Sequence, residues 1–287
     1  MRKTVVRRQV RGYGLVAEYV RPQGKKNLSP LIVLGGSAGG INPARAARLA
    51  DEGFAALAVG YFRLPGLSPT LAHIPLEYFG GAIEWLLARP EVSGSTVGVL
   101  GGSRGAELAL QLASLDQRIG AVVAYAPSSV RWAGYPVARP LPEAAWLFDG
   151  KPLPFMLPDG RQLSFDQALN LRHERRHAVI EVEKSAGPIL LISGEDDQVW
   201  PSTRMAHQII RRLGQKGFPY EYRHLSYLTA GHRITFPGRT LSEYSPSGVH
   251  PMTGETFHYG GTPEGNEAAS EHSWPAVVSF FQRHLRN

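Results

Sequence analysis

Ser103 lies in a local pattern that suggests nucleophilic chemistry. Residues 101–105 read GGSRG, which has the form G-x-S-x-G, and they stand between an apolar β-branched run at 97–100 and a helical pattern at 104–113. A turn this sharp strains the backbone of its central residue, and its crowded neighbours need glycine, which has no Cβ. The pattern predicts that the Ser103 hydroxyl stands at the carboxyl end of a strand, where the N–H of Arg104 binds an oxyanion. A plain Gly/Ser turn between strand and helix is the alternative.

An acidic residue and a histidine, each after a later predicted strand, complete the set that such a serine needs. The predicted strand at 188–193 leads to the adjacent acids Asp196 and Asp197, and the predicted strand at 220–225 leads to His232. A carboxylate after a strand orients a histidine by accepting its Nδ1–H, and the histidine takes the proton of the serine. Asp197 is the predicted acid because it stands three residues after the glycine that ends its strand. Alternatively, both acids cap the helix that follows.

The glycine-rich segment at 35–40 follows a short apolar run at 31–34. A nucleotide-binding loop would need the order G-x-G-x-x-G or a following Lys-Ser/Thr pair, and the segment has neither. Small residues after a central strand instead let backbone N–H groups approach a substrate oxygen, so we predict the second half of an oxyanion hole here. Ser37 is the predicted donor beside Arg104, and Ala38 is the near alternative.

Apolar runs and helical patterns alternate along the chain. Two short strands at 5–10 and 15–20 predict an antiparallel hairpin. The later alternation predicts a mostly parallel central sheet with helices on both faces, and an active site at the carboxyl ends of its strands. Together with the order of nucleophile, acid and base, this layout predicts an α/β-hydrolase fold in one domain, residues 1–287. The predicted core strands are 31–34, 54–59, 97–100, 120–126, 188–193 and 220–225, and the predicted helices are 43–52, 74–89, 104–113, 203–214 and 274–285.

The alternation breaks between residues 128 and 184. This segment contains prolines, a charged helical stretch and apolar clusters around Trp132, Trp146 and Phe155. An irregular insertion of this length at the active-site end of a sheet is usually functional, and we predict a lid that shapes an acyl pocket. Aromatic residues in the loop at 61–66 either border the site or pack in the core.

Histidines occur in two groupings that resemble metal sites. Residues 173–177 read HERRH, which has the H-E-x-x-H form of zinc proteases. Their flanks are rich in arginine, no third ligand follows clearly and the segment lies outside the predicted sheet, so we predict no zinc site there. His250, His258 and His272 are predicted to be scattered surface residues, and we predict neither a metal nor another cofactor.

The composition is that of a globular protein, with 43% hydrophobic and 19% charged residues. Cysteine is absent, which excludes a disulfide framework and thiolate chemistry. No apolar run approaches the roughly 18 residues of a membrane span, and the basic start leads into no signal-peptide core, so we expect no membrane span and a cytoplasmic protein. The net charge of +7 favours anionic partners, but no nucleic-acid-binding signature accompanies it, and we expect no nucleic-acid partner. The sequence does not indicate an oligomeric state.

From residue 12 to the end, the chain resembles the carboxyl-terminal domain of acyl-CoA thioesterases and bile-acid-CoA:amino-acid N-acyltransferases. The stretches that carry the resemblance are LGGSAGG, YFRLPGLSPTLAHIPLEYF, EWLLARPEV, GGSRGAELAL, GPILLISGEDDQVWPS, AGHRI and FHYGGTPEGNEAASEHSWPAVVSFFQRHL. The resemblance implies an α/β-hydrolase fold and acyl transfer from a thioester, with Ser103, Asp197 and His232 as nucleophile, acid and base. Eukaryotic members carry an amino-terminal β-sandwich domain, whereas residues 1–30 precede the first predicted core strand here. The amino-acid-conjugating transferase uses cysteine as its nucleophile, so a serine at this position favours hydrolysis.

These observations predict a serine hydrolase that cleaves acyl thioesters through an acyl-enzyme. His232 takes the Ser103 proton, Asp197 holds the imidazole, and the N–H groups of Ser37 and Arg104 hold the oxyanion. An oxygen ester uses the same machinery, so a carboxylesterase is the alternative within the class, followed by an acyltransferase. A non-catalytic binding protein of the same fold is the alternative from another class, and it is disfavoured because all three triad positions are filled. The expected partner is a small acyl ester or thioester substrate.

Overall fold

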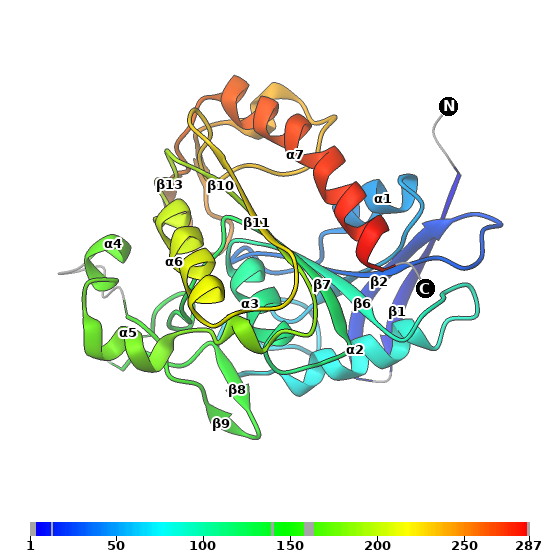
Figure 1. Cartoon of the computed structure of the whole chain (residues 1–287), viewed down its shortest axis with the longest axis horizontal. Coiled ribbons are helices and arrows are strands. Elements are labelled where there is room, and N and C mark those ends of the chain that lie inside the picture. The colour runs from blue at the N-terminus through cyan, green and yellow to red at the C-terminus, as the bar shows by residue number, and fades with distance from the viewer. Residues whose placement is uncertain (1–3, 13, 139–140, 158–163, 286–287) are drawn as a thin grey trace.

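A large sheet forms the centre of the computed structural model, which describes residues 4–12, 14–138, 141–157 and 164–285 (Figure 1). Its eight strands are β1 Val5–Gly12, β2 Leu15–Pro22, β3 Pro30–Leu34, β4 Ala55–Gly60, β6 Val97–Gly102, β7 Ile119–Tyr125, β10 Ile189–Gly194 and β11 Tyr222–Tyr227. Their order across the sheet is β1-β2-β4-β3-β6-β7-β10-β11. Non-consecutive neighbours such as β4 and β3 show that the chain crosses over between strands, as a helix-connected sheet requires.

The sheet is antiparallel at one edge and parallel elsewhere. Strands β1 and β2 form a hairpin in which Gly12 pairs with Leu15, and β2 runs antiparallel to β4. The six strands from β4 to β11 in the sheet order are parallel to one another. The predicted hairpin and the predicted mostly parallel sheet are therefore confirmed. Because parallel strands end at the same edge, the loops that follow them meet there.

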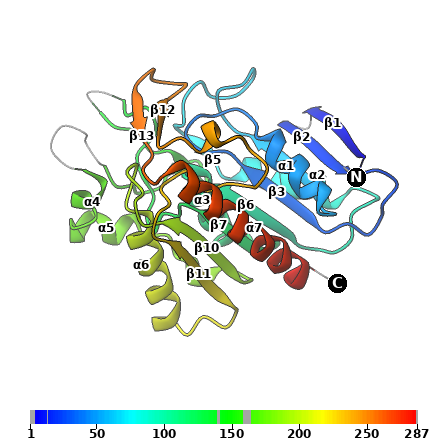
Figure 2. The same ribbon diagram turned by 90° about the horizontal axis from the view of Figure 1, so that it is seen from above.

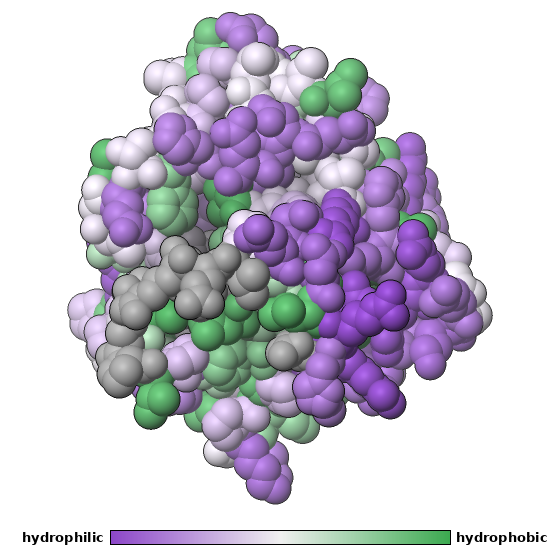
Figure 3. Space-filling view, turned by 90° about the vertical axis from the view of Figure 1, so that its left-hand side faces the viewer, coloured by the Kyte–Doolittle hydropathy of each residue, from purple (hydrophilic) through white to green (hydrophobic). Residues whose placement is uncertain are grey.

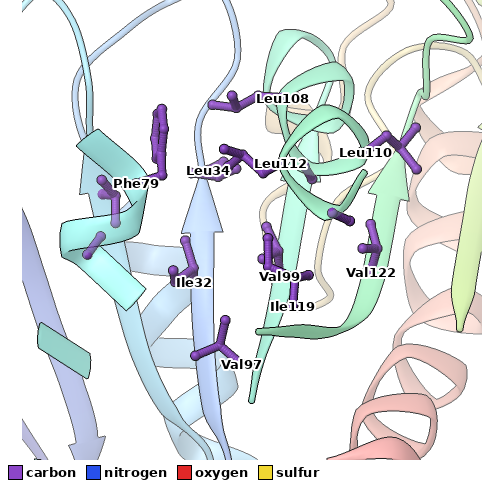
Figure 4. Close-up of a cluster of buried hydrophobic side chains, with 14 of the residues drawn as sticks. Ile32, Leu34, Phe79, Val97, Val99, Leu108, Leu110, Leu112, Ile119 and Val122 are labelled. Atoms are coloured by element: carbon purple, nitrogen blue, oxygen red, sulfur yellow. The ribbon is translucent and has the colours of Figure 1, made fainter. Parts of the chain in front are cut away.

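Helices cover both faces of the sheet. One face is covered by α1 Pro43–Asp51 and α7 Pro263–His284. Figure 2 shows the molecule from the side of α7. The other face carries α2 Glu77–Leu87, α3 Arg104–Ala113 and α6 Ser202–Gln215. Successive side chains of a strand point to opposite faces, and β3 divides its residues in this way. Ile32 and Leu34 pack in the cluster of α2 and α3 (Figure 4), whereas Leu31 and Val33 pack with α1 and α7.

Two predicted helix boundaries were wrong. The helix predicted at 74–89 begins only at Glu77, because Ile74 and Pro75 form the short strand β5 and the Ile74 N–H donates to the Ala145 carbonyl at 2.9 Å. The last helix, predicted to start at residue 274, begins at Pro263, where the Thr262 side chain caps it. The buried residues in its first half are small or polar, so the sequence there lacks the helical spacing of large apolar residues. These residues are Gly265, Asn266, Ala269, Ser270 and Ser273.

The segment predicted as an insertion connects β7 to β10 through short elements. These are β8 Trp146–Phe148, β9 Lys151–Pro152, α4 Phe165–Ala168, α5 Arg172–Ala178 and the 3-10 turn η1 Val182–Lys184. β8 pairs with β5 and places Trp146 in the main core, so this part of the segment packs as core. Trp132 belongs to a separate cluster with Phe165 and Trp200 near the carboxyl edge of the sheet. The division of the chain into domains stays a prediction.

The region between β11 and α7 also has structure that the sequence patterns did not predict. It contains the 3-10 turn η2 Leu241–Tyr244 and a two-stranded sheet of β12 Ser247–Val249 and β13 Thr256–His258. Among the helices of the described residues, none is long and apolar enough to cross a membrane.

Candidate active site

Ser103 occupies the turn between β6 and α3 in a strained conformation. Its backbone has φ 56° and ψ −125°, a region that residues with a Cβ rarely adopt. A Cβ on Gly101 would collide with the Gly105 carbonyl, and a Cβ on Gly105 would collide with the Gly35 carbonyl. The two glycines of the G-x-S-x-G pattern are therefore required by close backbone packing. Arg104 follows as the first residue of α3, where backbone N–H groups have no acceptor within the helix.

Asp197 lies in the loop after β10 and accepts several hydrogen bonds. The donors include the backbone N–H groups of Val199 and Trp200, at 3.0 and 3.2 Å, and the Ser202 hydroxyl at 2.6 Å. The side chain is only 2% exposed. The residue at the N-cap of α6 is Pro201, with no side-chain cap, so the alternative role of the acids as helix caps does not hold. These bonds fix the direction of the Asp197 carboxylate.

His232 lies in the loop after β11 and faces Asp197. Its Nδ1 donates to the Asp197 carboxylate, at 2.8 Å from Oδ2 and 3.0 Å from Oδ1. Its backbone N–H donates to the Tyr259 carbonyl at 2.7 Å, which ties the loop to the segment before α7. Asp196 points elsewhere and accepts from the Gly261 N–H at 2.7 Å. Of the two adjacent acids, the structure brings Asp197 to the histidine.

Ser103 and His232 line the same cavity, which has a volume of about 540 Å³. We call it the polar cavity, because charged and polar side chains contribute to its wall, which the loops after β3, β6 and β11 form together with the start of α1. Besides Ser103 and His232, the lining residues include Gly36, Arg45, Arg233 and Arg239. The predicted nucleophile and base therefore share one cavity at the carboxyl edge of the sheet, and the predicted acid adjoins it through its bond to His232.

A second, smaller cavity of about 90 Å³ also reaches Ser103, and its wall is mostly apolar. Trp132, Val137 and Phe165 of the insertion line it, together with Trp200 and Phe257. A wider opening of about 450 Å³ adjoins it, and the two share the lining residues Tyr135, Val137, Phe165, Val199 and Trp200. Figure 3 faces the side of the molecule that carries α4 and α5, where hydrophobic side chains gather in a region surrounded by hydrophilic ones.

Ser37 lines the apolar cavity beside Ser103, whereas Ala38 is exposed. The loop that carries them is held by its neighbours. The Tyr61 hydroxyl donates to the Gly35 carbonyl at 2.5 Å, and Arg63 donates to the Ala38 carbonyl at 2.8 Å. Tyr61, the first aromatic residue of the loop at 61–66, is buried in the core. Its hydroxyl group holds the glycine-rich loop in place.

His250 is a site residue that the sequence patterns did not identify. The prediction that it lies on the surface was wrong: it is 3% exposed, and its Nε2 lies 3.0 Å from the Ser37 hydroxyl. The Met252 N–H donates to Nδ1 at 3.3 Å, so Nε2 carries the proton and donates to Ser37. Burial and the nearby Arg63 lower the pKa of His250. His258 and His272 are exposed, as predicted.

A buried ion pair lies directly behind the nucleophile. Nη1 of Arg104 is 3.3 Å from the Glu107 carboxylate, and the other Glu107 oxygen accepts from the Trp146 indole N–H at 2.6 Å and the Trp132 backbone N–H at 3.2 Å. Burial raises the pKa of Glu107 and lowers that of Arg104, and the opposite charge of each partner acts against this shift. The pair connects the insertion to the first turn of α3, and no sequence pattern indicated it.

The H-E-x-x-H run forms part of α5, away from this site. His173 and His177 are exposed, and their ring centroids are 4.9 Å apart. Within the described ranges, no group of three or more His, Asp or Glu side chains is arranged to hold a metal ion.

The sheet order, the strained serine after β6 and the acid and histidine after the last two strands are features of α/β-hydrolases. Solved structures of that class share the fold. A dienelactone hydrolase-like promiscuous phosphotriesterase from metagenomic libraries aligns with a TM-score of 0.59 at 19% identity, over 98% of this chain and 99% of its own. A putative dienelactone hydrolase from Klebsiella pneumoniae aligns with a TM-score of 0.59 at 15% identity, over 98% of each chain. The predicted fold class is confirmed.

Within this class, the chain belongs to the family described as BAAT / Acyl-CoA thioester hydrolase C terminal, whose sequence pattern matches residues 74–287. Human acyl-coenzyme A thioesterase 6 is 32% identical in an alignment of 289 positions, which covers 99% of this chain and 67% of the thioesterase. Mouse acyl-coenzyme A amino acid N-acyltransferase 1 is 32% identical in an alignment of 271 positions, which covers 92% of this chain and 62% of the transferase. The chain thus spans about three fifths to two thirds of the length of these relatives.

Proposed function

We propose that this protein is a serine hydrolase that cleaves acyl thioesters. The observation that carries the proposal is the 2.8 Å hydrogen bond from His232 Nδ1 to Asp197, made by a histidine that lines the same cavity as Ser103. An imidazole held by its Nδ1–H presents Nε2 as a base, which is the arrangement that activates a serine hydroxyl. The relationship to acyl-CoA thioesterases supports a thioester as the substrate.

In this mechanism, His232 takes the proton of Ser103 as the serine oxygen attacks the thioester carbonyl. The oxyanion that forms accepts hydrogen bonds from the backbone N–H groups of Arg104 and Ser37. His232 then gives its proton to the leaving sulfur, and an acyl-Ser103 intermediate remains. Water, activated by the same histidine, releases the carboxylic acid. Asp197 holds the imidazole in the required tautomer throughout.

Ser103 lines two cavities, and each can bind one part of the substrate, either the acyl group or the leaving group. The apolar cavity that Trp132 and Phe165 line suits the acyl chain, because each methylene buried there gains about 0.8 kcal/mol. The polar cavity contains His232, which must lie within hydrogen-bond reach of the leaving atom. We therefore assign the acyl group to the apolar cavity and the leaving group to the polar one.

The test compares thioesters with oxygen esters that carry the same acyl group. Acyl-CoAs and p-nitrophenyl esters from acetyl to long chains are offered to the protein, and kcat/KM is measured for each. We expect the acyl-CoAs to be the better substrates at matched chain length. Better turnover of every p-nitrophenyl ester would instead identify a carboxylesterase.

A matched variant separates enzyme from binding protein. The change Ser103→Ala is expected to lower kcat on the order of 10⁶-fold, since removing the nucleophile of a serine enzyme has that effect. A fluorophosphonate probe is expected to label the wild-type protein at Ser103 and to leave the variant unlabelled. An unlabelled, inactive wild-type protein would show that the fold serves binding alone.

Transfer to an amine is a second candidate, favoured by the 32% identity to a mouse amino acid N-acyltransferase. Hydrolysis and transfer share the acyl-enzyme and differ only in the acceptor. Adding an amino acid to the acyl-CoA reaction and separating the products distinguishes them, because a hydrolase yields free fatty acid and a transferase yields the amide.

A further inference from the structure

Arg45 of α1 is a buried cation on the wall of the polar cavity. The residue is 7% exposed, and its Nη2 donates to the Thr235 hydroxyl at 2.7 Å. No Asp or Glu of the described residues lies within 4.0 Å of its guanidinium nitrogens. Burial lowers the pKa of Arg45 to about 10, which leaves the side chain charged at neutral pH. A buried charge without a counter-ion is costly and usually has a partner.

The contacts of Arg45 within the protein use only part of its hydrogen-bonding capacity. The guanidinium lies 5.3 Å from the centre of the Tyr125 ring and 6.0 Å from that of Phe236, so aromatic faces stabilise the charge. Among the described residues, neither Nε nor Nη1 has a hydrogen-bond acceptor. Nη1 lies 3.2 Å from the position that a Cβ on Gly102 would take, which places unused donors beside the residue that precedes the nucleophile.

The rest of the polar cavity has the same sign of charge. Arg233 and Arg239 also line it, and Glu243 is the one acid among its described lining residues. The Glu243 carboxylate already accepts from Arg239 at 2.7 Å and from the Thr240 N–H at 2.9 Å. The cavity therefore has an excess of positive charge near Ser103, and an anionic group bound there would be attracted by it.

We propose that Arg45, with Arg239 at the rim, forms an anion subsite that binds a carboxylate or phosphate group on the leaving group of the substrate. The assignment to the leaving group rests on the proposed function, because His232 protonates that group and lines this cavity. A guanidinium with two free donors binds carboxylate and phosphate oxygens with charge-assisted hydrogen bonds. A carboxylate a few bonds from the sulfur would contact Arg45 itself, and the phosphates of CoA, beyond the pantetheine arm, would contact the rim.

Two pairs of matched thioesters test the subsite. The first pair is S-butyryl-3-mercaptopropionate and its neutral amide, which differ in a carboxylate near the sulfur. The second pair is butyryl-CoA and butyryl-pantetheine, which differ in the phosphates. We measure the ratio of kcat/KM within each pair, because any loss common to both substrates cancels. We expect Arg45→Gln to lower the first ratio, or Arg239→Gln to lower the second ratio, by about 10- to 100-fold, the effect of losing a hydrogen bond to a charged group. A lowered first ratio identifies a carboxylate, and a lowered second ratio a phosphate.

Arg48 supplies the matched control on the same helix. It pairs with Glu52 at 3.0 Å and lies over the Trp274 ring, so Arg48→Gln makes the same charge change away from the cavity. We expect this variant to keep both wild-type ratios. An unchanged first ratio in Arg45→Gln together with an unchanged second ratio in Arg239→Gln would overturn the proposal and leave Arg45 as a packing residue that anchors Thr235. If Arg45→Gln does not fold, Arg239→Gln is tested with both pairs, and two unchanged ratios overturn the proposal.

A binding measurement tests the anion subsite independently of the hydrolytic reaction. Titration calorimetry compares 3-mercaptopropionate with its amide on the wild-type protein and on Arg45→Gln, and CoA with pantetheine on the wild-type protein and on Arg239→Gln. The subsite requires tighter binding of an anionic member by the wild type, with that preference lost in the variant. A wild-type protein that hydrolyses no thioester yet keeps this preference would contradict the proposed function and support the subsite. Equal binding of the anionic and neutral members would overturn the subsite alone.

Discussion

His232 and Asp197 are joined by a hydrogen bond of 2.8 Å, although 35 positions separate them in the chain and they follow different strands. The bond selects one of two adjacent acids, since Asp196 accepts from the Gly261 N–H instead. We therefore expect Asp197→Asn to lower kcat by about 10⁴-fold with the fold intact, because an amide holds the imidazole in the wrong tautomer. Steady-state kinetics with an acyl-CoA measure the loss, and circular dichroism checks the fold.

Asp196→Asn is the matched control for this prediction. It makes the same chemical change one residue earlier, at a side chain that holds the Gly261 backbone. We expect a loss in kcat of less than about tenfold, because the Asp197 contacts with His232 and Ser202 stay in place. A larger loss for Asp196→Asn than for Asp197→Asn would mean that the acid has been assigned to the wrong residue.

The candidate site was predictable where its residues follow strands directly. Ser103, Asp197 and His232 each stand within a few residues of the end of a strand, and those before Ser103 and Asp197 are buried and apolar, so a regular sheet brings the three to one edge. Ser37 and His250 meet for a different reason: the glycine-rich loop contacts the β12–β13 turn, and no local pattern encodes that meeting. The burial of Arg45 was not predictable for the same reason, because it depends on contacts with Thr235 and Phe236, which lie far away in the sequence. The spacing of apolar residues also failed to predict a helix where small residues are buried, as in the first half of α7.

Ser37 is expected to act through its backbone rather than its hydroxyl. The change Ser37→Ala keeps the N–H and removes the oxygen that accepts from His250 Nε2 at 3.0 Å. We expect kcat to fall less than tenfold, whereas loss of an oxyanion donor costs about 10²- to 10³-fold. The melting temperature should fall, because a buried imidazole N–H is left without an acceptor. A loss of 10²-fold or more in kcat for Ser37→Ala would identify the hydroxyl as the donor.

His224 is expected to make the fold sensitive to acid. Its Nε2 lies 2.8 Å from the Ser193 hydroxyl, and burial, with the nearby His207, lowers its pKa from 6.5 to about 4. Between these values the unfolded chain binds a proton that the folded protein does not, so stability is fully present above pH 6.5 and falls as pH drops toward 4. We expect His224→Gln to show a shallower fall in melting temperature over this window than the wild type. His272→Gln, at an exposed position, should keep the wild-type slope, and equal slopes in all three proteins would contradict the prediction.

Trp132 and Trp146 are expected to separate acyl-chain selection from core packing. Both are 1% exposed, but Trp132 lines the apolar cavity beside Ser103, whereas Trp146 packs in the main core and donates to Glu107. We expect Trp132→Ala to change the ratio of kcat/KM between long and short acyl-CoAs by about tenfold, since each methylene buried in a pocket is worth about 0.8 kcal/mol. Trp146→Ala removes the same side chain from the core and should lower stability by about 3 to 5 kcal/mol while leaving that ratio unchanged. Acyl-CoAs from acetyl to long chains and thermal melts measure the two effects, and an unchanged ratio in Trp132→Ala would show that the insertion does not select the chain.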